Sequence, residues 1–178
     1  MVLVLSLMAL TGCIKPTPPA TAEPGLRITV VALAEGAGAA EVVDTPARFD
    51  SSILDVLALR GLTAELVEGG RLGPVSAARE SSLRVERLRG DFAEGAMLLV
   101  ETRPGYYAEM NGQYRWVVGV TLTLSASQSR PNQTVEFDVP VFLRYHHQRE
   151  ADAVDAAGGV VARRVGELAD DWLRAAGG

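Results

Sequence analysis

Cysteine and histidine are nearly absent from this sequence, and their scarcity excludes several kinds of site. The 178 residues include one cysteine, Cys13, and two histidines. One cysteine cannot form a disulfide within the chain, and a zinc site of the usual cysteine and histidine kind lacks ligands. His146 and His147 are adjacent, and neighbours on a strand point to opposite faces, so they cannot share a metal in regular geometry. We expect no metal site and no cofactor.

The chain also lacks an excess of basic residues and an apolar run long enough to span a membrane. Its formal net charge is −5. Nucleic acid is therefore not an expected partner, because phosphate binding needs clustered lysine and arginine. The mostly aliphatic residues 1–12 would rise about 18 Å as a helix, less than the roughly 30 Å of a bilayer core. This length suits the apolar region of a secretory signal. No basic residue precedes it, so we expect that translation starts upstream or that the chain has been trimmed.

Recognisable catalytic motifs are missing as well. Gly36-Ala37-Gly38 follows a predicted strand but lacks the third glycine of a dinucleotide-binding loop, so a surface loop is the favoured interpretation. None of the serines lies in a G-x-S-x-G sequence. Glu136, Asp138 and the pair Asp170-Asp171 are compatible with ordinary surface positions. The sequence predicts no catalytic residue and no enzyme.

The residues around the single cysteine form the most specific motif. Leu10, Thr11, Gly12 and Cys13 follow the apolar run and resemble the lipobox of bacterial lipoproteins. The resemblance implies cleavage before Cys13, a thioether-linked diacylglycerol on its sulfur and usually an acylated amine. More than one acyl chain gives stable anchoring. Ile14, rather than aspartate, follows the cysteine, which implies the outer membrane with the domain facing the periplasm.

Proline is concentrated directly after the cysteine. Four prolines lie within residues 14–25, a composition that forms neither a helix nor a sheet interior. Extended at about 3.1 Å per residue, this stretch spans on the order of 35 Å. We expect a signal segment over residues 1–12, an acylated cysteine and tether over 13–25, and one globular domain over 26–178.

The first half of that domain mixes one strand with two helices. Residues 26–33 are β-branched and aliphatic, as in a buried strand, and a loop follows. Asp50-Ser51-Ser52 predicts the start of a helix that ends near Gly61. Residues 62–70 fit a strand or a continuation of that helix. A second helix is predicted over 77–90, capped by Ser76, with Leu83 and Leu88 on its apolar side.

The second half predicts a three-stranded antiparallel meander. Residues 96–102 form a strand that could extend through Tyr107, and Asn111-Gly112 is a strong hairpin signal. Both following strands alternate, with a turn at 127–133 and an apolar face. Pro140 suggests that the last strand lies at an edge or carries a bulge. The residues predicted to face the core are Tyr114, Trp116, Val118, Val120, Leu122, Leu124, Val135, Phe137, Val139, Val141, Leu143 and Tyr145.

A single apolar stripe at helical spacing runs through the C-terminal segment. Gly158-Gly159 weakens the middle of this helix and predicts a kink or a late start. The stripe consists of Val154, Ala157, Val161, Val165, Leu168 and Trp172. We therefore predict an α+β fold in the order β-α-(β)-α-β-β-β-α, with a small mixed or antiparallel sheet and helices on one or both faces.

Two groups of residues are candidates for a contact surface. Arg79, Arg84, Arg87 and Arg89 are expected to face outward, which favours a solvated helix face over a patch for anionic glycan or lipid. Tyr106 and Tyr107 cluster with Tyr114 and Trp116 around the hairpin. Cross-strand packing is the favoured interpretation and an exposed aromatic surface the alternative, since tyrosine and tryptophan are common at interfaces. Tyr106 and Tyr107 must point to opposite faces of a regular strand.

The segment GDFAEGAMLLVET at residues 90–102, together with the meander and final helix, resembles a group of envelope lipoprotein domains. The group comprises the lipoprotein activators of penicillin-binding proteins (LpoB type), the curli secretion lipoprotein and the N-terminal domain of the Tol-system propeller protein. This resemblance implies a non-catalytic accessory domain that binds an envelope protein, such as a synthase or an outer-membrane barrel. A lipopolysaccharide-assembly lipoprotein (LptE type) is the alternative, and an envelope hydrolase is the least favoured.

Overall fold

A computed structural model describes residues 26–35, 42–67, 81–92, 95–125 and 132–176, and the lipobox, Arg79, the Ser76 cap and most of the turn at 127–133 lie outside them. One mixed sheet organises the described part of the chain. The elements follow the order β1 (Arg27–Glu35), β2 (Val42–Asp44), α1 (Ala47–Ala58), β3 (Thr63–Leu66), α2 (Ser81–Phe92), β4 (Ala96–Met110), β5 (Gln113–Ser125), β6 (Gln133–Leu143) and α3 (Glu150–Ala176).

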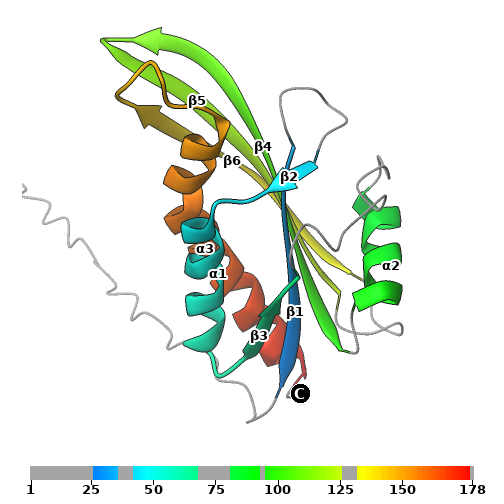
Figure 1. Cartoon of the computed structure of the whole chain (residues 1–178). Coiled ribbons are helices and arrows are strands. Elements are labelled where there is room, and N and C mark those ends of the chain that lie inside the picture. The colour runs from blue at the N-terminus through cyan, green and yellow to red at the C-terminus, as the bar shows by residue number, and fades with distance from the viewer. Residues whose placement is uncertain (1–25, 36–41, 68–80, 93–94, 126–131, 177–178) are drawn as a thin grey trace, which may run out of the picture.

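The sheet order is β2-β1-β4-β5-β6, with β3 paired to the first part of β1. β1 runs parallel to β3 and to β4, while β2, β5 and β6 pair antiparallel with their neighbours. Helices α1 and α3 cover one face and α2 lies against the other (Figure 1). The predicted α+β class is confirmed, the sheet is mixed, and helices occupy both faces.

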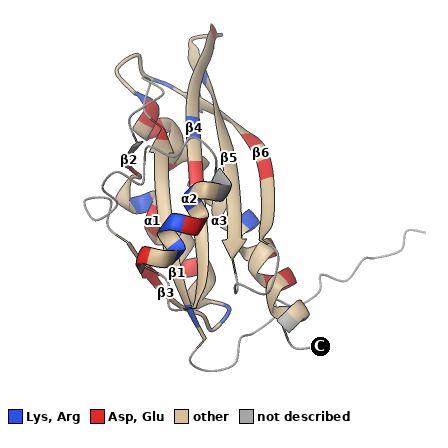
Figure 2. Ribbon diagram, turned by 90° about the vertical axis from the view of Figure 1, so that its right-hand side faces the viewer, with Lys and Arg blue, Asp and Glu red and all other residues tan. Residues whose placement is uncertain are grey.

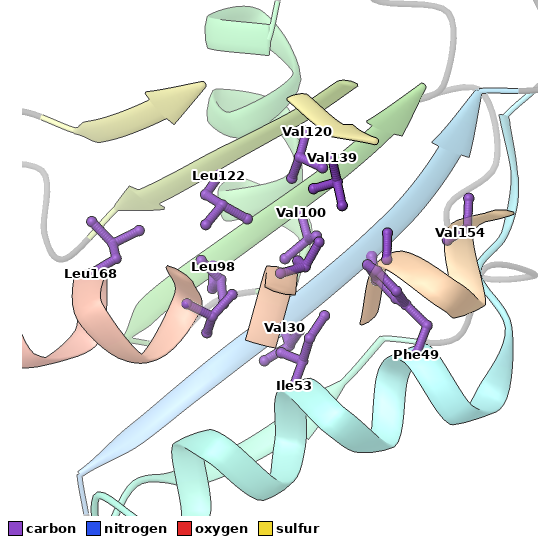
Figure 3. Close-up of a cluster of buried hydrophobic side chains, with 14 of the residues drawn as sticks. Val30, Phe49, Ile53, Leu98, Val100, Val120, Leu122, Val139, Val154 and Leu168 are labelled. Atoms are coloured by element: carbon purple, nitrogen blue, oxygen red, sulfur yellow. The ribbon is translucent and has the colours of Figure 1, made fainter. Parts of the chain in front are cut away.

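The main core lies between the sheet and the helices α1 and α3 (Figure 3). Alternating residues of the four longest strands point into it, among them Val30, Leu98 and Leu122. The whole predicted stripe of α3 is buried there. A Cβ at Gly158 would make ordinary contacts with Phe49, 3.6 Å from its Cα, and a Cβ at Gly159 would meet nothing within 4 Å. The predicted late start is wrong, because α3 begins at Glu150 and continues through the glycine pair as one helix.

A smaller core lies beneath α2 on the opposite face. Val85 and Leu88 of the helix are buried together with Met97 and Leu99 of β4 and three further residues of β1 and the segment after β3. This cluster occupies the half of the sheet where β1 pairs with the first residues of β4. Helix α2 therefore covers one end of its face of the sheet.

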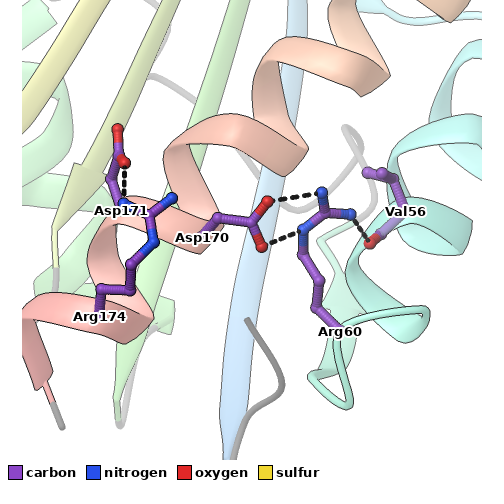
Figure 4. A network of polar contacts seen from close by, with 5 residues as sticks. All are labelled: Val56, Arg60, Asp170, Asp171 and Arg174. Atoms are coloured by element: carbon purple, nitrogen blue, oxygen red, sulfur yellow. Dashed lines mark hydrogen bonds and ion pairs between the residues drawn. The ribbon is translucent and has the colours of Figure 1, made fainter. Parts of the chain in front are cut away.

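Arg60 joins the end of α1 to α3 (Figure 4). Its Nε donates to Asp170 Oδ1 at 2.8 Å and its Nη2 to Asp170 Oδ2 at 2.9 Å, while Nη1 donates to the carbonyl of Val56 at 2.9 Å. The two side chains are 13% and 14% exposed. Gly166 lies directly beneath the guanidinium. The prediction that Asp170 is an ordinary surface carboxylate is wrong, because in this bidentate ion pair its side chain is largely buried.

The hairpin between β4 and β5 forms at the predicted residues. Asn111 and Gly112 have φ of 53° and 73°, the left-handed values that a type I′ turn requires at both central positions. Pro140 lies on β6, an edge strand, as expected. Tyr145 and Val135 differ from the predicted core face, since both are exposed near the two ends of β6.

Several boundaries differ from the sequence-based expectations. α1 begins at Ala47 after Pro46, so Asp50 lies in its first turn instead of capping it. β2 lies in the predicted loop, where pairing with β1 stabilises three residues. α2 continues past Gly90 to Phe92. The helix is also rotated relative to the prediction: Leu83 is exposed and Arg84 is buried. None of the helices in the described ranges is long and apolar enough to cross a membrane.

Candidate functional site

The hairpin of β4 and β5, together with the end of β6, projects beyond β1 (Figure 1). β1 stops pairing with β4 at Ala34 and Thr102, whereas β4 continues to Met110. β6 accompanies β5 almost to the hairpin turn, because Leu143 pairs with Tyr114, the second residue of β5. Among the described elements, none covers the α2 side of this half of the sheet, because the contacts of α2 lie at the other end.

Exposed apolar side chains gather at this projecting end. Of the nine large exposed hydrophobic residues in the described ranges, five lie here: Tyr106, Tyr107, Met110, Phe142 and Tyr145. Tyr106 packs edge-on against the buried Trp116, with ring centroids 5.6 Å apart. Tyr106 and Tyr107 are both exposed, and the contact of Tyr106 with Trp116 is a cross-strand packing contact.

Tyr107, Arg115 and Phe142 form a continuous surface that we call the aromatic patch. The pairing register shifts at Tyr107, which is a bulge residue with no partner on β5. The guanidinium of Arg115 lies 4.7 Å from the centre of the Tyr107 ring, a cation–π arrangement. Arg115 is in turn paired with Phe142 on β6. Tyr107 and Phe142 are 67% and 53% exposed.

A polar depression lies next to the aromatic patch on the same face of the sheet. It has a volume of about 300 Å³, and Gly119 leaves space in its lining. We call it the acidic hollow. Figure 2 shows acidic positions on β6 and charged positions on β4 from this side. Its charged lining residues are Glu35, Glu101, Arg103, Glu136 and Asp138.

Arg103 holds Glu35 at one side of the acidic hollow. Its Nε and Nη2 donate to the two carboxylate oxygens of Glu35 at 2.6 and 3.1 Å. The hydrogen bonds from Arg103 are the main reason why the pKa of Glu35 lies below its usual value. The same contact raises the pKa of Arg103. Both groups are therefore charged at neutral pH.

Arg84 and Glu101 form a buried ion pair at the base of the acidic hollow, on the side of α2. Arg84 is 5% exposed and Glu101 is 8% exposed. Glu101 Oε2 makes no hydrogen bond within the described residues. The predicted outward position of Arg84 is wrong because this carboxylate, 17 residues away on β4, draws the guanidinium onto the sheet.

The two other described arginines of α2, Arg87 and Arg89, differ in their exposure and contacts. Arg87 is exposed on α2, as predicted. Arg89 is partly buried and its guanidinium donates to the hydroxyl of Ser125 at the end of β5. The basic surface expected on this helix is thus reduced to Arg87 among its described arginines.

The two histidines lie in the loop after β6. The His147 ring stacks on Tyr145 with centroids 5.5 Å apart, and the His146 ring meets it edge-on. Within the described ranges, no group of three or more potential metal ligands occurs. The loop instead adds aromatic surface beside the end of β6.

Sequence reasoning found the tyrosines and missed the acidic hollow. Glu136 and Asp138 were visible as the polar partners of an alternating strand. Their meeting with Glu35 and Arg103 depends on the pairing of β1 with β4 and of β5 with β6. The useful signal was the alternation of charges at positions 101 and 103 and at positions 136 and 138, which places each pair on one face of its own strand. Strand β5 lies between these two strands.

No family model matches this chain, and a comparison with curated proteins finds no match either. Solved structures do resemble it. A lipoprotein from Caulobacter crescentus CB15 is 16% identical with a TM-score of 0.44, over 83% of this chain and 90% of that one. Lipoprotein GNA1162 from Neisseria meningitidis is 15% identical with a TM-score of 0.43, over 81% and 98%. Rare lipoprotein B from Shewanella oneidensis is 7% identical with a TM-score of 0.33, over 85% and 93%. The solved structures that this chain resembles thus include bacterial lipoproteins.

Proposed function

We propose that this chain is a bacterial envelope lipoprotein, anchored through acyl chains on Cys13, that binds another envelope protein as a non-catalytic accessory. The observation that carries the proposal is the aromatic patch at the projecting end of the sheet. Tyr107 and Phe142 expose most of their rings there. Such rings lose little conformational entropy on binding and often dominate the energy of an interface.

The geometry of the aromatic patch supports binding because a cation–π contact and strand pairing link its residues. Arg115 lies over the ring of Tyr107 and pairs across the ladder with Phe142. The cation–π contact restrains the Tyr107 ring, and a restrained side chain loses less entropy on association. Tyr107 lies on the Arg115 face because successive residues of a strand point to opposite faces and Tyr106 pairs with Trp116.

The charge state of the acidic hollow supports binding over acid catalysis. A general acid at neutral pH needs a carboxyl group with a raised pKa. The pKa of Glu35 is lowered by Arg103, and Glu101 is paired with Arg84. These carboxylates are suited to holding a positive charge rather than to donating a proton.

A photo-crosslinking residue at Tyr107 tests the proposal in cells of the native host. We expect a discrete adduct with one envelope protein, and we expect Phe142→Ser to reduce its yield severalfold. The matched control is the same residue at Leu59, which is 79% exposed directly after α1. The C-terminal end of this helix lies at the opposite end of the molecule from the hairpin (Figure 1). Equal adducts at both positions, or adducts with lipid alone at Tyr107, would contradict the proposal.

The membrane anchor has its own test. Cys13→Ala removes the sulfur that the lipobox resemblance implies is acylated, so the protein should lose incorporated fatty acid and leave the membrane fraction. Unchanged membrane association would refute the anchor while leaving the aromatic patch untouched. Separation of inner and outer membranes then tests the proposed outer-membrane location.

Lipopolysaccharide assembly is the alternative role, and binding of lipopolysaccharide through the basic helix would favour it. Arg84 is buried and Arg89 is partly buried against Ser125. Exposed Arg87 is what remains of that surface among the described arginines. The structure therefore favours the aromatic patch over α2 as the place of contact.

A further inference from the structure

The acidic hollow and the aromatic patch are parts of one surface. Across β5 and β6, the pairs run in successive rows on the α2 side: Thr121 with Glu136, Gly119 with Asp138, Val117 with Pro140 and Arg115 with Phe142. The first two rows belong to the acidic hollow and the last row to the aromatic patch. A ligand lying along β6 on this face would contact both.

The acidic hollow has an excess of negative charge. Arginines pair with two of its four carboxylates, Glu35 and Glu101. Glu136 and Asp138 have no ion pair within the described residues, so two negative charges remain. Both side chains line the same concave surface, and a concave surface of one charge sign attracts opposite charge more strongly than a flat one.

Glu101 adds a second, independent reason for a cation. It is more than nine-tenths buried, it lines the acidic hollow, and its Oε2 has no hydrogen-bond partner within the described residues. A buried carboxylate oxygen without a partner is energetically costly. A positive charge placed between Glu136 and Asp138 would lower that cost through space, without displacing Arg84.

We propose that the acidic hollow receives a lysine or arginine side chain of the bound partner, while an apolar side chain of the same segment packs on Tyr107 and Phe142. This inference rests on the proposed function and specifies the chemistry of the partner. Asp138 and Phe142 are four residues apart on β6, roughly 13 Å at 3.3 Å per residue. An extended segment presents its residues i and i+4 on one side at the same spacing.

The charge of the acidic hollow disfavours an anionic ligand there, and the cation of the adjoining patch, Arg115, lies over Tyr107. A phosphate or a lipid headgroup phosphate would be repelled by Glu136 and Asp138 and would find Arg103 already bound to Glu35. The expected occupant is therefore a basic segment of a protein, with its cationic and apolar anchors four residues apart.

Two synthetic peptides test this inference on the acylated full chain in detergent micelles, with empty micelles as the blank. One has arginine and phenylalanine at its ends with three serines between them, and the other has glutamine in place of arginine. Both are made in the two chain directions. We expect the arginine peptide to bind about threefold to tenfold more tightly in low salt, and the difference to shrink as salt is added.

Variants of the protein then locate the effect. The double change Glu136→Gln with Asp138→Asn should abolish the preference for arginine, and Phe142→Ser should weaken both peptides equally. Equal affinity of the two peptides for the unchanged protein, a preference that survives the double change, or no binding of either peptide would each overturn the inference.

The crosslinking experiment separates this inference from the proposed function. If the Tyr107 adduct forms and the double change leaves its yield unaltered, the cation site is wrong and the partner-binding role stands. If no protein adduct forms at Tyr107 while the arginine preference is present and lost in the double variant, the cation site stands and the proposed function is wrong.

Discussion

Gly166→Ala should destabilise the protein even though it places the best helix former inside a helix. A Cβ at this position would lie 2.6 Å from Arg60 Nη2 and 2.7 Å from its Cζ. Ordinary carbon contacts begin at about 3.5 Å, so the guanidinium must move by roughly 1 Å. Its two hydrogen bonds to Asp170, now 2.8 and 2.9 Å long, would then be lost or severely bent.

The size of the effect follows from two opposing contributions. Replacing glycine with alanine in a helix interior stabilises by about 1 kcal/mol. Hydrogen bonds to charged groups contribute about 1.5–3 kcal/mol each, and this pair is largely buried. We expect one of the two hydrogen bonds to Asp170 to be lost as the guanidinium shifts, so Gly166→Ala should lower the free energy of unfolding by about 0.5–2 kcal/mol. In the Arg60→Ala variant, adding Gly166→Ala should raise the free energy of unfolding by about 0.5–1 kcal/mol relative to Arg60→Ala alone, because the clash has been removed.

Urea denaturation followed by circular dichroism measures these free energies. Gly159→Ala is the matched control, since it lies in the same helix and a Cβ there meets nothing within 4 Å. We expect it to stabilise by up to about 1 kcal/mol. If Gly166→Ala alone stabilises the protein as much as Gly159→Ala does, the guanidinium of Arg60 does not lie over Gly166 and the reasoning fails.

Three further changes probe the core, the turn and the acidic hollow. Leu98→Ala should lower the free energy of unfolding by about 2–5 kcal/mol, whereas Leu59→Ala on the surface should change it by less than about 0.5 kcal/mol; similar losses would contradict the core assignment. Gly112→Ala should cost about 1 kcal/mol, because its φ of 73° is unfavourable for alanine, and no loss would argue against the type I′ turn. In the folded protein the hydrogen bonds from Arg103 lower the pKa of Glu35. The contribution of this ion pair to the free energy of unfolding is therefore fully present above the unfolded-state pKa of Glu35 and is lost as the pH falls through its folded-state pKa. Glu35→Gln should therefore make stability less dependent on pH in this acidic range, and an unchanged acid profile would refute the pairing.

The parts of the fold that the sequence predicted are those with local causes. Alternation defines β5 and the buried end of β6, Asn111-Gly112 defines the hairpin, and one apolar stripe defines α3. Each of these signals lies within a few residues of the structure that it specifies. The order of elements could therefore be predicted before any long-range contact was known.

The structure differs from the sequence-based expectations where contacts between residues far apart in the chain determine it. β2 is three residues long and depends on β1 for its hydrogen bonds, so its own composition resembles a loop. The sequence around Arg84 predicts a surface residue, whereas in the fold Arg84 is buried against Glu101 of β4. The acidic hollow requires the pairing of strands that are far apart in the chain. Helix periodicity cannot reveal which face of a sheet a helix will cover.

The prolines at 104 and 140 have a consequence for how this sheet ends. Beyond Thr102, β4 has no neighbour on the β1 side among the described strands, and β6 is an outer strand. Long exposed edges invite other strands to add to the sheet and so promote aggregation. Proline offers no amide hydrogen, and the bulge at Tyr107 breaks the regular spacing of donors. The projecting hairpin is thereby protected against strand addition while its aromatic side chains remain exposed.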